Sequence, residues 1–498
     1  RISKCNPCAP LTTDIDILTS FPRSNVRTQG YGQNPLLPRA TYLRLVHRQT
    51  MGTTSSKEKS CCSSGSSRGE DKFPKSSPSL ISISVPAHPP EARGRSHGSQ
   101  LSSEIAALWL AWTTSLDNTS GASPGTSQRA ALSYAAQVWP VITALAPESA
   151  VEIKAIAVAA NQPLLVIVAL NCYDEIGLVE PLESEDIDPK NTGFRGHCTG
   201  VSLGWDGEGA GVVLGQSWDC PLYYRPVLLL KVVSQDGHSD QVHLTFPGIV
   251  AGPCMSTKMA IGWFTVVPTS PRQAGLPNPV LLREALSCCE STAAAMEFFA
   301  ASKRCAGSCF IVCDAAGDMA AFESDASTSS VLPARRGGSD ISTGRIATDK
   351  ATNIATHRAT DGATHTTTDT ATGSAIDSAT TFIVHANHFC APDLVKVDAG
   401  RIDWSTRRHA RAESLVNTIP HPPHSAEESF SVIQGILADT HGKEQGVSIC
   451  EHADCTGGQW ETLAAIMFDP QKLQYRVKGG RPDDDNIPWQ MCHLGERE

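Results

Sequence analysis

The chain has 498 residues, a length that predicts one large domain or two ordinary ones with additional tails. Apolar residues make up 40% of the chain, which is enough for a core over much of its length. The net charge is −10 without a long basic run, so we expect no nucleic-acid partner. The longest apolar run, 163–170, is far shorter than the ~20 residues of a membrane helix.

The cysteine content points to a reducing environment. Seventeen cysteines are present, an odd number that lacks the regular spacing of a small disulfide scaffold. We therefore expect most of them to be reduced and buried, as in the cytoplasm. We also expect no secretory signal, because no basic segment followed by an apolar one opens the sequence.

The N-terminal half divides into two parts. Residues 1–100 are rich in Ser, Pro, Gly and charge and lack sustained periodicity, which predicts a disordered N-terminal region. Residues 101–197 are expected to form a helical part, because apolar residues recur at helical spacing. The predicted helices cover 101–116, 127–147, 148–162 and 163–177, the last with Pro163 in its first turn.

From Cys198 onward, alternating and β-branched residues between Gly-rich turns predict strands, with helices among them. The predicted strands are 198–206, 209–219, 225–234, 241–248, 259–267, 308–317, 318–325, 381–389, 461–470 and 474–480. The predicted helices are 278–291, 292–303, 405–418 and 426–438. Helices first and then mostly antiparallel strands with helices between them is an α+β layered pattern. Residues 198–498 are expected to form this second part.

Residues 340–381 interrupt that part with a repeat in which Ala recurs every four positions, with Thr367 in one gap. The spacing imitates a helical stripe, but Thr, Asp and Gly stand between the alanines and no large apolar residue is available to face a core. We interpret the segment as a disordered insert between two strands. A solvated helical spacer is the alternative.

One cysteine is distinguished from the others by its surroundings. Cys198 follows a Gly-containing turn and opens a predicted strand, and Asp219 lies 21 positions later in "LGQSWD". "HANHF" (385–389) then places polar residues in an apolar strand, and "STRRHAR" (405–411) follows. A buried structural thiol is the more common role for a cysteine. The residues alone therefore leave both a structural and a nucleophilic role open.

Four motifs together carry a family resemblance. "VALNCYDEI", "GHCTG", "LGQSWD" and "HANHF" occur in this order and resemble the acyl-coenzyme A:6-aminopenicillanic acid acyltransferase family of N-terminal-nucleophile enzymes. The resemblance extends over residues 101–490, apart from the repeat. It implies a four-layer αββα sandwich of two antiparallel sheets between helices, in which residues 101–197 become a smaller subunit.

The resemblance also implies a mechanism and its residues. The Cys198 thiol would attack the carbonyl of His197, cleave that bond and become the N-terminus of a second chain. The new α-amino group, with a reference pKa of about 7.7–8.0, would then act as the base for the thiol. Asp219 would orient this amine, Asn387 would contribute to the oxyanion site, and Arg408 would hold the carboxylate network.

Three of the motifs depart from the family pattern. His197 stands where Gly is usual before the cysteine, and "QSWDC" replaces "QNWDW". Ser256, in "CMST", stands at a usual Asn of the oxyanion site, which makes it the oxyanion candidate here. The alternative to an enzyme is therefore a weak or inactive scaffold, tethered to a membrane, that keeps the fold. A choloylglycine-hydrolase-like amidase is a second alternative, although it would have Arg in place of Gln216.

The expected substrate is a small linear amide or acyl donor. Acyl transfer or hydrolysis would proceed through a thioester on Cys198, with water or an amine as the acceptor. We expect no cofactor, although acyl-coenzyme A is an acyl donor that the resemblance allows. The two cleaved subunits are expected to stay together as a heterodimer, and the fold alone identifies no substrate.

No metal site is expected. Cys450, His452 and Cys455 lie on one short segment without a second ligand pair at zinc-finger spacing, so we interpret them as structural. The "GEGAGVVLG" segment lacks the lysine of a phosphate-binding loop and is interpreted as a hairpin. The three aspartates 483–485 are interpreted as a solvated turn.

Residues 51–62, "MGTTSSKEKSCC", predict a lipid anchor if translation begins at Met51. Removal of Met51 would expose Gly52 in an N-myristoylation pattern, and Cys61 and Cys62 would be available for palmitoylation. Two acyl chains anchor a protein stably, whereas one does so only marginally. We therefore expect a cytoplasmic protein that this segment could hold at the cytosolic face of a membrane. A chance Met-Gly in a Ser-rich tail is the alternative.

Deletion of residues 340–381 tests the interpretation of the repeat. Because long surface loops add little closure entropy, the deletion should leave the melting temperature and the yield of soluble protein nearly unchanged. Differential scanning calorimetry of the full chain and the deletion variant measures this. Loss of soluble protein on deletion would show that the repeat packs against the core.

Overall fold

The computed structural model describes residues 80–177, 197–205, 210–237, 239–268, 272–336, 380–398, 403–445, 447–454 and 460–496. All of them belong to one compact unit, Pro74–Glu498. The lipidation candidates Gly52, Cys61 and Cys62, and residues 340–379 of the repeat, lie outside the described residues. None of the described helices is both long and apolar enough to cross a bilayer.

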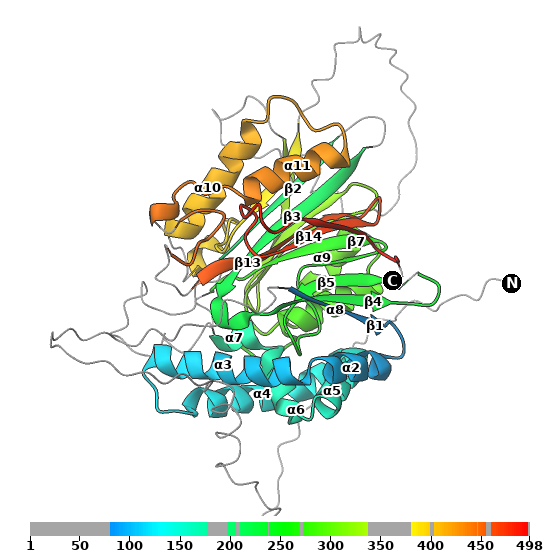
Figure 1. The fold of residues 1–498 in the computed structure, drawn as a ribbon, viewed down its shortest axis with the longest axis vertical. Coiled ribbons are helices and arrows are strands. Elements are labelled where there is room, and N and C mark those ends of the chain that lie inside the picture. The colour runs from blue at the N-terminus through cyan, green and yellow to red at the C-terminus, as the bar shows by residue number, and fades with distance from the viewer. Residues whose placement is uncertain are drawn as a thin grey trace, which may run out of the picture. The chain divides into compact units, whose positions relative to one another are not determined.

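Two β-sheets form the centre of this unit (Figure 1). Within the described residues, the first sheet has eight strands in the order β1-β4-β5-β6-β7-β8-β9-β10. Their bounds are Leu80–Pro86 (β1), Val227–Val233 (β4), Gln241–Thr245 (β5), Cys254–Ser256 (β6), Met259–Phe264 (β7), Ser308–Asp314 (β8), Met319–Ser324 (β9) and Ser329–Pro333 (β10). Strand β1 pairs in parallel with β4, and the other neighbours are antiparallel.

The second sheet is antiparallel throughout and has seven strands in the described part of the chain, in the order β11-β12-β2-β3-β13-β14-β15. Their bounds are Arg335–Arg336 (β11), Thr381–His385 (β12), His197–Trp205 (β2), Gly211–Pro221 (β3), Trp460–Asp469 (β13), Gln474–Gly479 (β14) and Gln490–His493 (β15). The predicted hairpin is confirmed, because Trp205 pairs with Gly211 at the end of β2 and β3.

The sheets pack against each other, and helices cover both outer faces. Strands β2 and β3 contact β7 and β8 across the interface. Helices α8 (Asn278–Cys288) and α9 (Thr292–Ala301) contact the first sheet, and α10 (Asp403–Asn417) and α11 (Ala426–Leu437) contact the second. The predicted αββα sandwich is therefore confirmed. Every residue of β3 is buried, including the polar Gln216, Ser217 and Asp219, because both faces of the strand are covered.

The remaining helices gather along one end of the sandwich, in blue and cyan in Figure 1. Their bounds are Pro90–Gln100 (α2), Ser102–Ser120 (α3), Thr126–Leu145 (α4), Pro147–Ala159 (α5), Leu164–Leu170 (α6) and Tyr173–Gly177 (α7). Most of these helices bury an apolar face, including the fully buried Trp112 of α3 and Val138 of α4.

The expectation of disorder through residue 100 is wrong for residues 80–100, which form β1 and α2. Helix α2 lacks an apolar stripe, so its sequence gave no helical signal. Tertiary contacts hold it instead, because Arg93 Nε lies 2.8 Å from Glu152 Oε2 of α5. A Cβ at Gly94 would overlap the Glu152 carbonyl oxygen, so the absence of a side chain allows the two helices to approach closely.

The single helix predicted at 163–177 is divided in two. Helix α6 ends at Leu170, and the side chain of Asn171 then bonds to a neighbouring loop. Its amide nitrogen donates to the Gly248 carbonyl at 3.0 Å, and its amide oxygen accepts from the Val250 N–H at 3.0 Å. The break redirects the chain, so α7 brings Tyr173 and Asp174 to the sheets.

A pair of Gly→Ala substitutions tests the packing between the sheets. A Cβ at Gly200 of β2 would overlap the buried ring of Phe264 in β7, so Gly200→Ala should destabilise the fold by about 1–3 kcal/mol. At Gly435 of α11 a Cβ meets nothing within 4 Å, so Gly435→Ala should stabilise by up to about 1 kcal/mol. Urea unfolding of both variants measures the difference, and equal free energies of unfolding would contradict the packing.

Candidate active site

Cys198 is the second residue of β2 and lies opposite Trp218 of β3. It is only 3% exposed. Burial raises the pKa of its thiol, the charge of Asp219 raises it further, and Arg408 opposes the effect without reversing it. In the uncut chain the sulfur is therefore held as the thiol. A base would be needed to convert it into the thiolate, which is the nucleophilic form.

The backbone of Cys198 is held by an asparagine from the end of a neighbouring strand. The Cys198 N–H donates to Asn387 Oδ1 at 2.7 Å. Asn387 is itself fixed, because its backbone N–H donates to Ser405 Oγ at 2.8 Å and its Nδ2 donates to the Thr265 carbonyl at 3.0 Å. In this state the side chain therefore positions the Cys198 nitrogen, and its donor group is engaged by Thr265.

Arg408 connects the parts of this arrangement from α10. Its Nη1 donates to the Cys198 carbonyl and to Thr199 Oγ1, both at 2.8 Å, and its Nη2 donates to Asn387 Oδ1 at 2.8 Å. Its guanidinium also lies over the Trp404 ring, 5.0 Å from the centroid. The side chain is fully buried.

The sequence pattern "STRRHAR" also leaves Arg407 as a candidate for the role of Arg408, and the two differ in burial. Arg407 is exposed, whereas Arg408 is buried and donates to the Cys198 carbonyl. Consecutive helical residues point about 100° apart, which explains why adjacent arginines have such different surroundings.

Asp219 lies at the end of β3 and pairs in register with His197. Its Oδ1 accepts a hydrogen bond from Thr462 Oγ1 at 2.6 Å, and Arg408 Nη1 lies 3.7 Å from its Oδ2. Burial raises the pKa of Asp219 to about 8, although the charge of Arg408 acts in the opposite direction. Asp219 is thus placed beside the bond that the mechanism would cleave.

Sequence reasoning missed a second buried carboxyl group, Asp174 of α7. Its Oδ2 accepts from Thr265 Oγ1 at 2.8 Å. Burial raises the pKa of Asp174 to about 7, while hydrogen bonds from Thr265 and Asn278 lower it by less. The charged pair Asp174-Glu175 after a long apolar run was the available signal, since acidic residues are rarely buried without a purpose.

A cavity of about 20 Å³ adjoins the Cys198 thiol. It is lined by Tyr173, Asp174, Cys198, Trp218, Asp219, Cys220, Pro221, Tyr224, Thr265 and Trp460. That volume holds about one water molecule and no acyl substrate. Because Tyr173 and Asp174 precede the expected cleavage site, the upstream part of the chain contributes to closing the site.

The assignment of Ser256 to the oxyanion site is wrong on geometry. Ser256 ends β6, in the turn before β7, and its Oγ accepts hydrogen bonds from the N–H groups of Lys258 and Met259. Cys198 lies beside Thr265, which follows the other end of β7. The length of that strand separates the two sites by roughly 20 Å.

The Cys450 and His452 pair gains a third neighbour, Asp483, and their ligand-type atoms lie within 4.8 Å of one another. Asp483 is half-buried, so the expectation of a solvated turn is wrong for this residue. Its Oδ1 also accepts from Arg481 Nε at 3.0 Å. This guanidinium would repel a cation at the same carboxylate, so the geometry favours the structural interpretation. Cys455 lies outside the described residues.

Comparison with known proteins gives one family match. Residues 338–484 match the model of the acyl-coenzyme A:6-aminopenicillanic acid acyl-transferase family, a region that contains Asn387 and Arg408. The predicted resemblance to this family is therefore confirmed over that region. No curated protein matches the chain.

Solved structures of two hydrolases are also similar. An N-acylethanolamine-hydrolyzing acid amidase ortholog from Caenorhabditis elegans has 11% identity and a TM-score of 0.32, covering 54% of this chain and 93% of that one. A mutant conjugated bile acid hydrolase from Clostridium perfringens has 10% identity and a TM-score of 0.34, covering 60% and 95%.

The raised pKa of Asp174 predicts a pH-dependent stability. Between about pH 4 and pH 7 the folded chain retains a proton that Asp174 loses on unfolding, so its contribution to the free energy of unfolding falls as pH rises. The slope is at most about −1.4 kcal/mol per pH unit, and it disappears above pH 7. Asp174→Asn should flatten this dependence, whereas Asp393→Asn, at an exposed position, should not. Urea unfolding at several pH values measures both, and identical slopes in the two variants would contradict the assignment.

Proposed function

We propose that the chain is an autoprocessing acyltransferase or amidohydrolase in which Cys198 is the nucleophile. The observation that carries the proposal is the clamp on Cys198, whose N–H donates to Asn387 Oδ1 and whose carbonyl accepts from Arg408. Any buried backbone N–H and C=O must be hydrogen-bonded, but here both partners are side chains that the family resemblance assigns to the site. These contacts would hold the Cys198 nitrogen in place for a reaction in which it takes part.

In the first step the Cys198 sulfur attacks the carbonyl carbon of His197. The C–N bond breaks, the acyl group passes to sulfur, and the released Cys198 nitrogen takes up the thiol proton. Water then hydrolyses the thioester, which leaves a carboxylate at His197 and a free thiol and amine at Cys198. The bond lies at the start of β2, where Asp219 pairs with His197.

In the second step the new amine serves as the base. Its reference pKa of about 7.7–8.0 suits proton transfer near neutral pH, so it can accept the proton of its own thiol. The amine would inherit the hydrogen bond to Asn387 Oδ1 that the N–H makes in the uncut chain. The thiolate then attacks a linear amide or acyl donor, the leaving group departs with a proton, and water or an amine accepts the acyl group from the thioester.

The small volume of the cavity fits a precursor better than a mature enzyme. Its volume of about 20 Å³ excludes an acyl group, and Tyr173 and Asp174 from the upstream part form one wall. Cleavage before Cys198 would free the end of that part and allow the wall to move. The aromatic side chains of Trp218, Phe246 and Trp263 nearby would then offer an apolar surface to an acyl chain.

Two alternatives differ from the proposed enzyme in features that can be observed. A choloylglycine-hydrolase-like amidase would have Arg in place of Gln216, and here the Gln216 amide bonds to the backbone N–H and carbonyl of Trp263. A charged guanidinium could not accept from that N–H, so Gln216 is adapted to this packing. A non-catalytic scaffold would remain one chain and would not react with an acylating thiol probe.

The state of the purified protein tests the proposal. Wild-type protein should give two fragments on a denaturing gel, with the larger one beginning Cys198-Thr199 by N-terminal sequencing. Cys198→Ala lacks the nucleophile and should give one uncut, inactive chain. Cys254→Ala, at a buried cysteine of the other sheet, is the matched control and should be cut normally.

Two results would contradict the proposal. Uncut wild-type protein with full activity would exclude a role for the free amine. Cleavage of Cys198→Ala at the same bond would show that an external protease makes the cut.

A further inference from the structure

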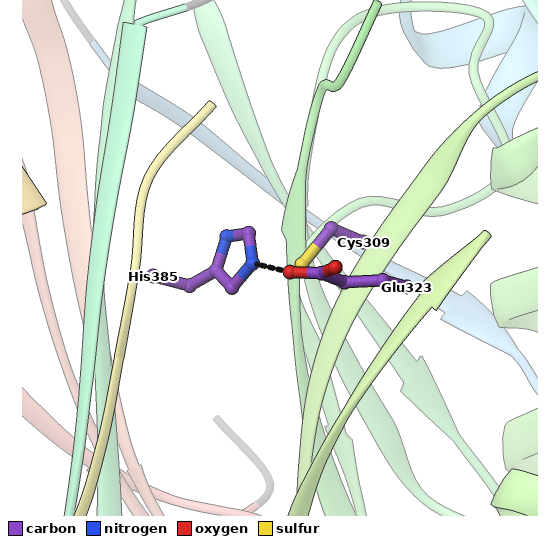
Figure 2. Close-up of side chains that lie close together, drawn as sticks. All are labelled: Cys309, Glu323 and His385. Atoms are coloured by element: carbon purple, nitrogen blue, oxygen red, sulfur yellow. Dashed lines mark hydrogen bonds and ion pairs between the residues drawn. The ribbon is translucent and has the colours of Figure 1, made fainter. Parts of the chain in front are cut away.

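A second cluster of reactive side chains lies between the two sheets. Cys309 of β8, Glu323 of β9 and His385 of β12 are at most 1% exposed. Figure 2 shows the imidazole of His385 facing the Glu323 carboxylate and the Cys309 sulfur from the opposite sheet. Their nitrogen, oxygen and sulfur atoms lie within 4.8 Å of one another. The proposed acyl-transfer mechanism uses none of these groups.

The hydrogen bonds define the protonation of this cluster. His385 Nδ1 lies 2.7 Å from the Ala386 carbonyl, which can only accept, so Nδ1 carries a proton. His385 Nε2 lies 2.6 Å from Glu323 Oε1. Burial raises the pKa of Glu323, but the bond and charge of His385 and the N–H groups of Ala391 and Cys390 outweigh it and lower the pKa. A proton must therefore lie between His385 and the carboxylate.

A second cysteine, Cys390, lies at the edge of this cluster. Its backbone N–H donates to Glu323 Oε1 at 2.8 Å, whereas its sulfur lies 3.8 Å from His388 Nε2 and 3.9 Å from His409 Nε2. The group of atoms within 4.8 Å of one another does not include the Cys390 thiol. One thiol, one imidazole and one carboxylate thus converge from three strands.

We propose that Cys309, Glu323 and His385 form a Zn²⁺ site with three protein ligands. One sulfur, one nitrogen and one oxygen are a donor set that tetrahedral zinc accepts, with water in the fourth position. His385 already donates Nδ1–H to a backbone carbonyl, the outer contact that orients Nε2 toward a metal. Zinc would displace the proton between His385 and Glu323 and the thiol proton of Cys309, both of which pass to solvent.

The change in geometry that binding requires is small. In tetrahedral zinc with bonds of about 2.0–2.1 Å, the nitrogen and oxygen ligands stand about 3.4 Å apart. His385 Nε2 and Glu323 Oε1 would therefore separate by roughly 0.8 Å from their present distance of 2.6 Å. Rotation of the two side chains can provide this without moving the strands.

A metal here would stabilise the position of the proposed active site without taking part in its reaction. His385 and Cys390 lie on either side of Asn387, whose side chain holds the Cys198 N–H. The intervening loop is already attached through Glu323 to the other sheet by the N–H groups of Cys390 and Ala391. Zinc would replace this proton-mediated attachment by bonds to both sheets, so the metal's role is structural and independent of whether cleavage occurs.

Zinc titration of the full-length protein tests the site. The protein is stripped with a chelator, then titrated with Zn²⁺ against a chromophoric competitor, and should bind about one ion per chain. Cys309→Ala removes one ligand and should weaken binding by about 100-fold or more, since outer contacts alone contribute about 10–100-fold. Cys313→Ala, equally buried on β8, and Cys450→Ala, from the other cluster, should bind like wild type.

Cobalt gives a second readout that does not depend on activity or affinity. Co²⁺-loaded wild-type protein should show sulfur-to-metal charge-transfer absorption, and Cys309→Ala should lose it because no thiolate ligand remains, whereas Cys390→Ala should retain it. Failure of the wild-type protein to bind Zn²⁺, or equal binding by Cys309→Ala and Cys313→Ala, would show that the cluster is only a buried His–Glu ion pair. Loss of binding in Cys450→Ala alone would place the metal at the other cluster.

Discussion

The buried guanidinium of Arg408 is the interaction on which the candidate site depends. A buried charge is costly unless it is paired and hydrogen-bonded. The groups that pair with this guanidinium belong to the candidate site, so their positions are fixed by the same contacts. Arg408 binds the Cys198 carbonyl, the Thr199 hydroxyl and the Asn387 amide oxygen, and it lies 3.7 Å from the Asp219 carboxylate. Three separate segments are therefore held together by one side chain from a helix on the outer face.

The end of β12 connects this site to the rest of the sandwich. His385 bonds to Glu323 of the opposite sheet, and Asn387, two residues later, bonds to Cys198 and to Thr265. Any movement between the sheets would displace Asn387 relative to the nucleophile. The His385–Glu323 contact, with or without a metal, therefore limits how far the clamp on Cys198 can relax.

The elements predicted from the sequence have an apolar pattern within their own residues, whereas the missed ones depend on contacts with other elements. Strands such as β3 and β13 and helix α11 have strong apolar patterns, and they appear close to the predicted positions. Helix α2 was missed because its polar sequence folds only against α5, through the contact of Arg93 with Glu152. Ser256 was misplaced because a motif match gives an order along the chain and no position along a strand.

The sequence by itself determined the α+β layered class and the position of Cys198 at the start of a strand, because periodicity is a local property. The family resemblance, which rests on the order of motifs, implied the αββα sandwich and the set that contains Asp219, Asn387 and Arg408. Only the tertiary structure decided that Asp174 lies beside Cys198 and that Cys309, Glu323 and His385 converge between the sheets. These contacts join residues up to 76 positions apart, and they follow from sheet register and helix packing. No pattern within a window of the sequence records either of them.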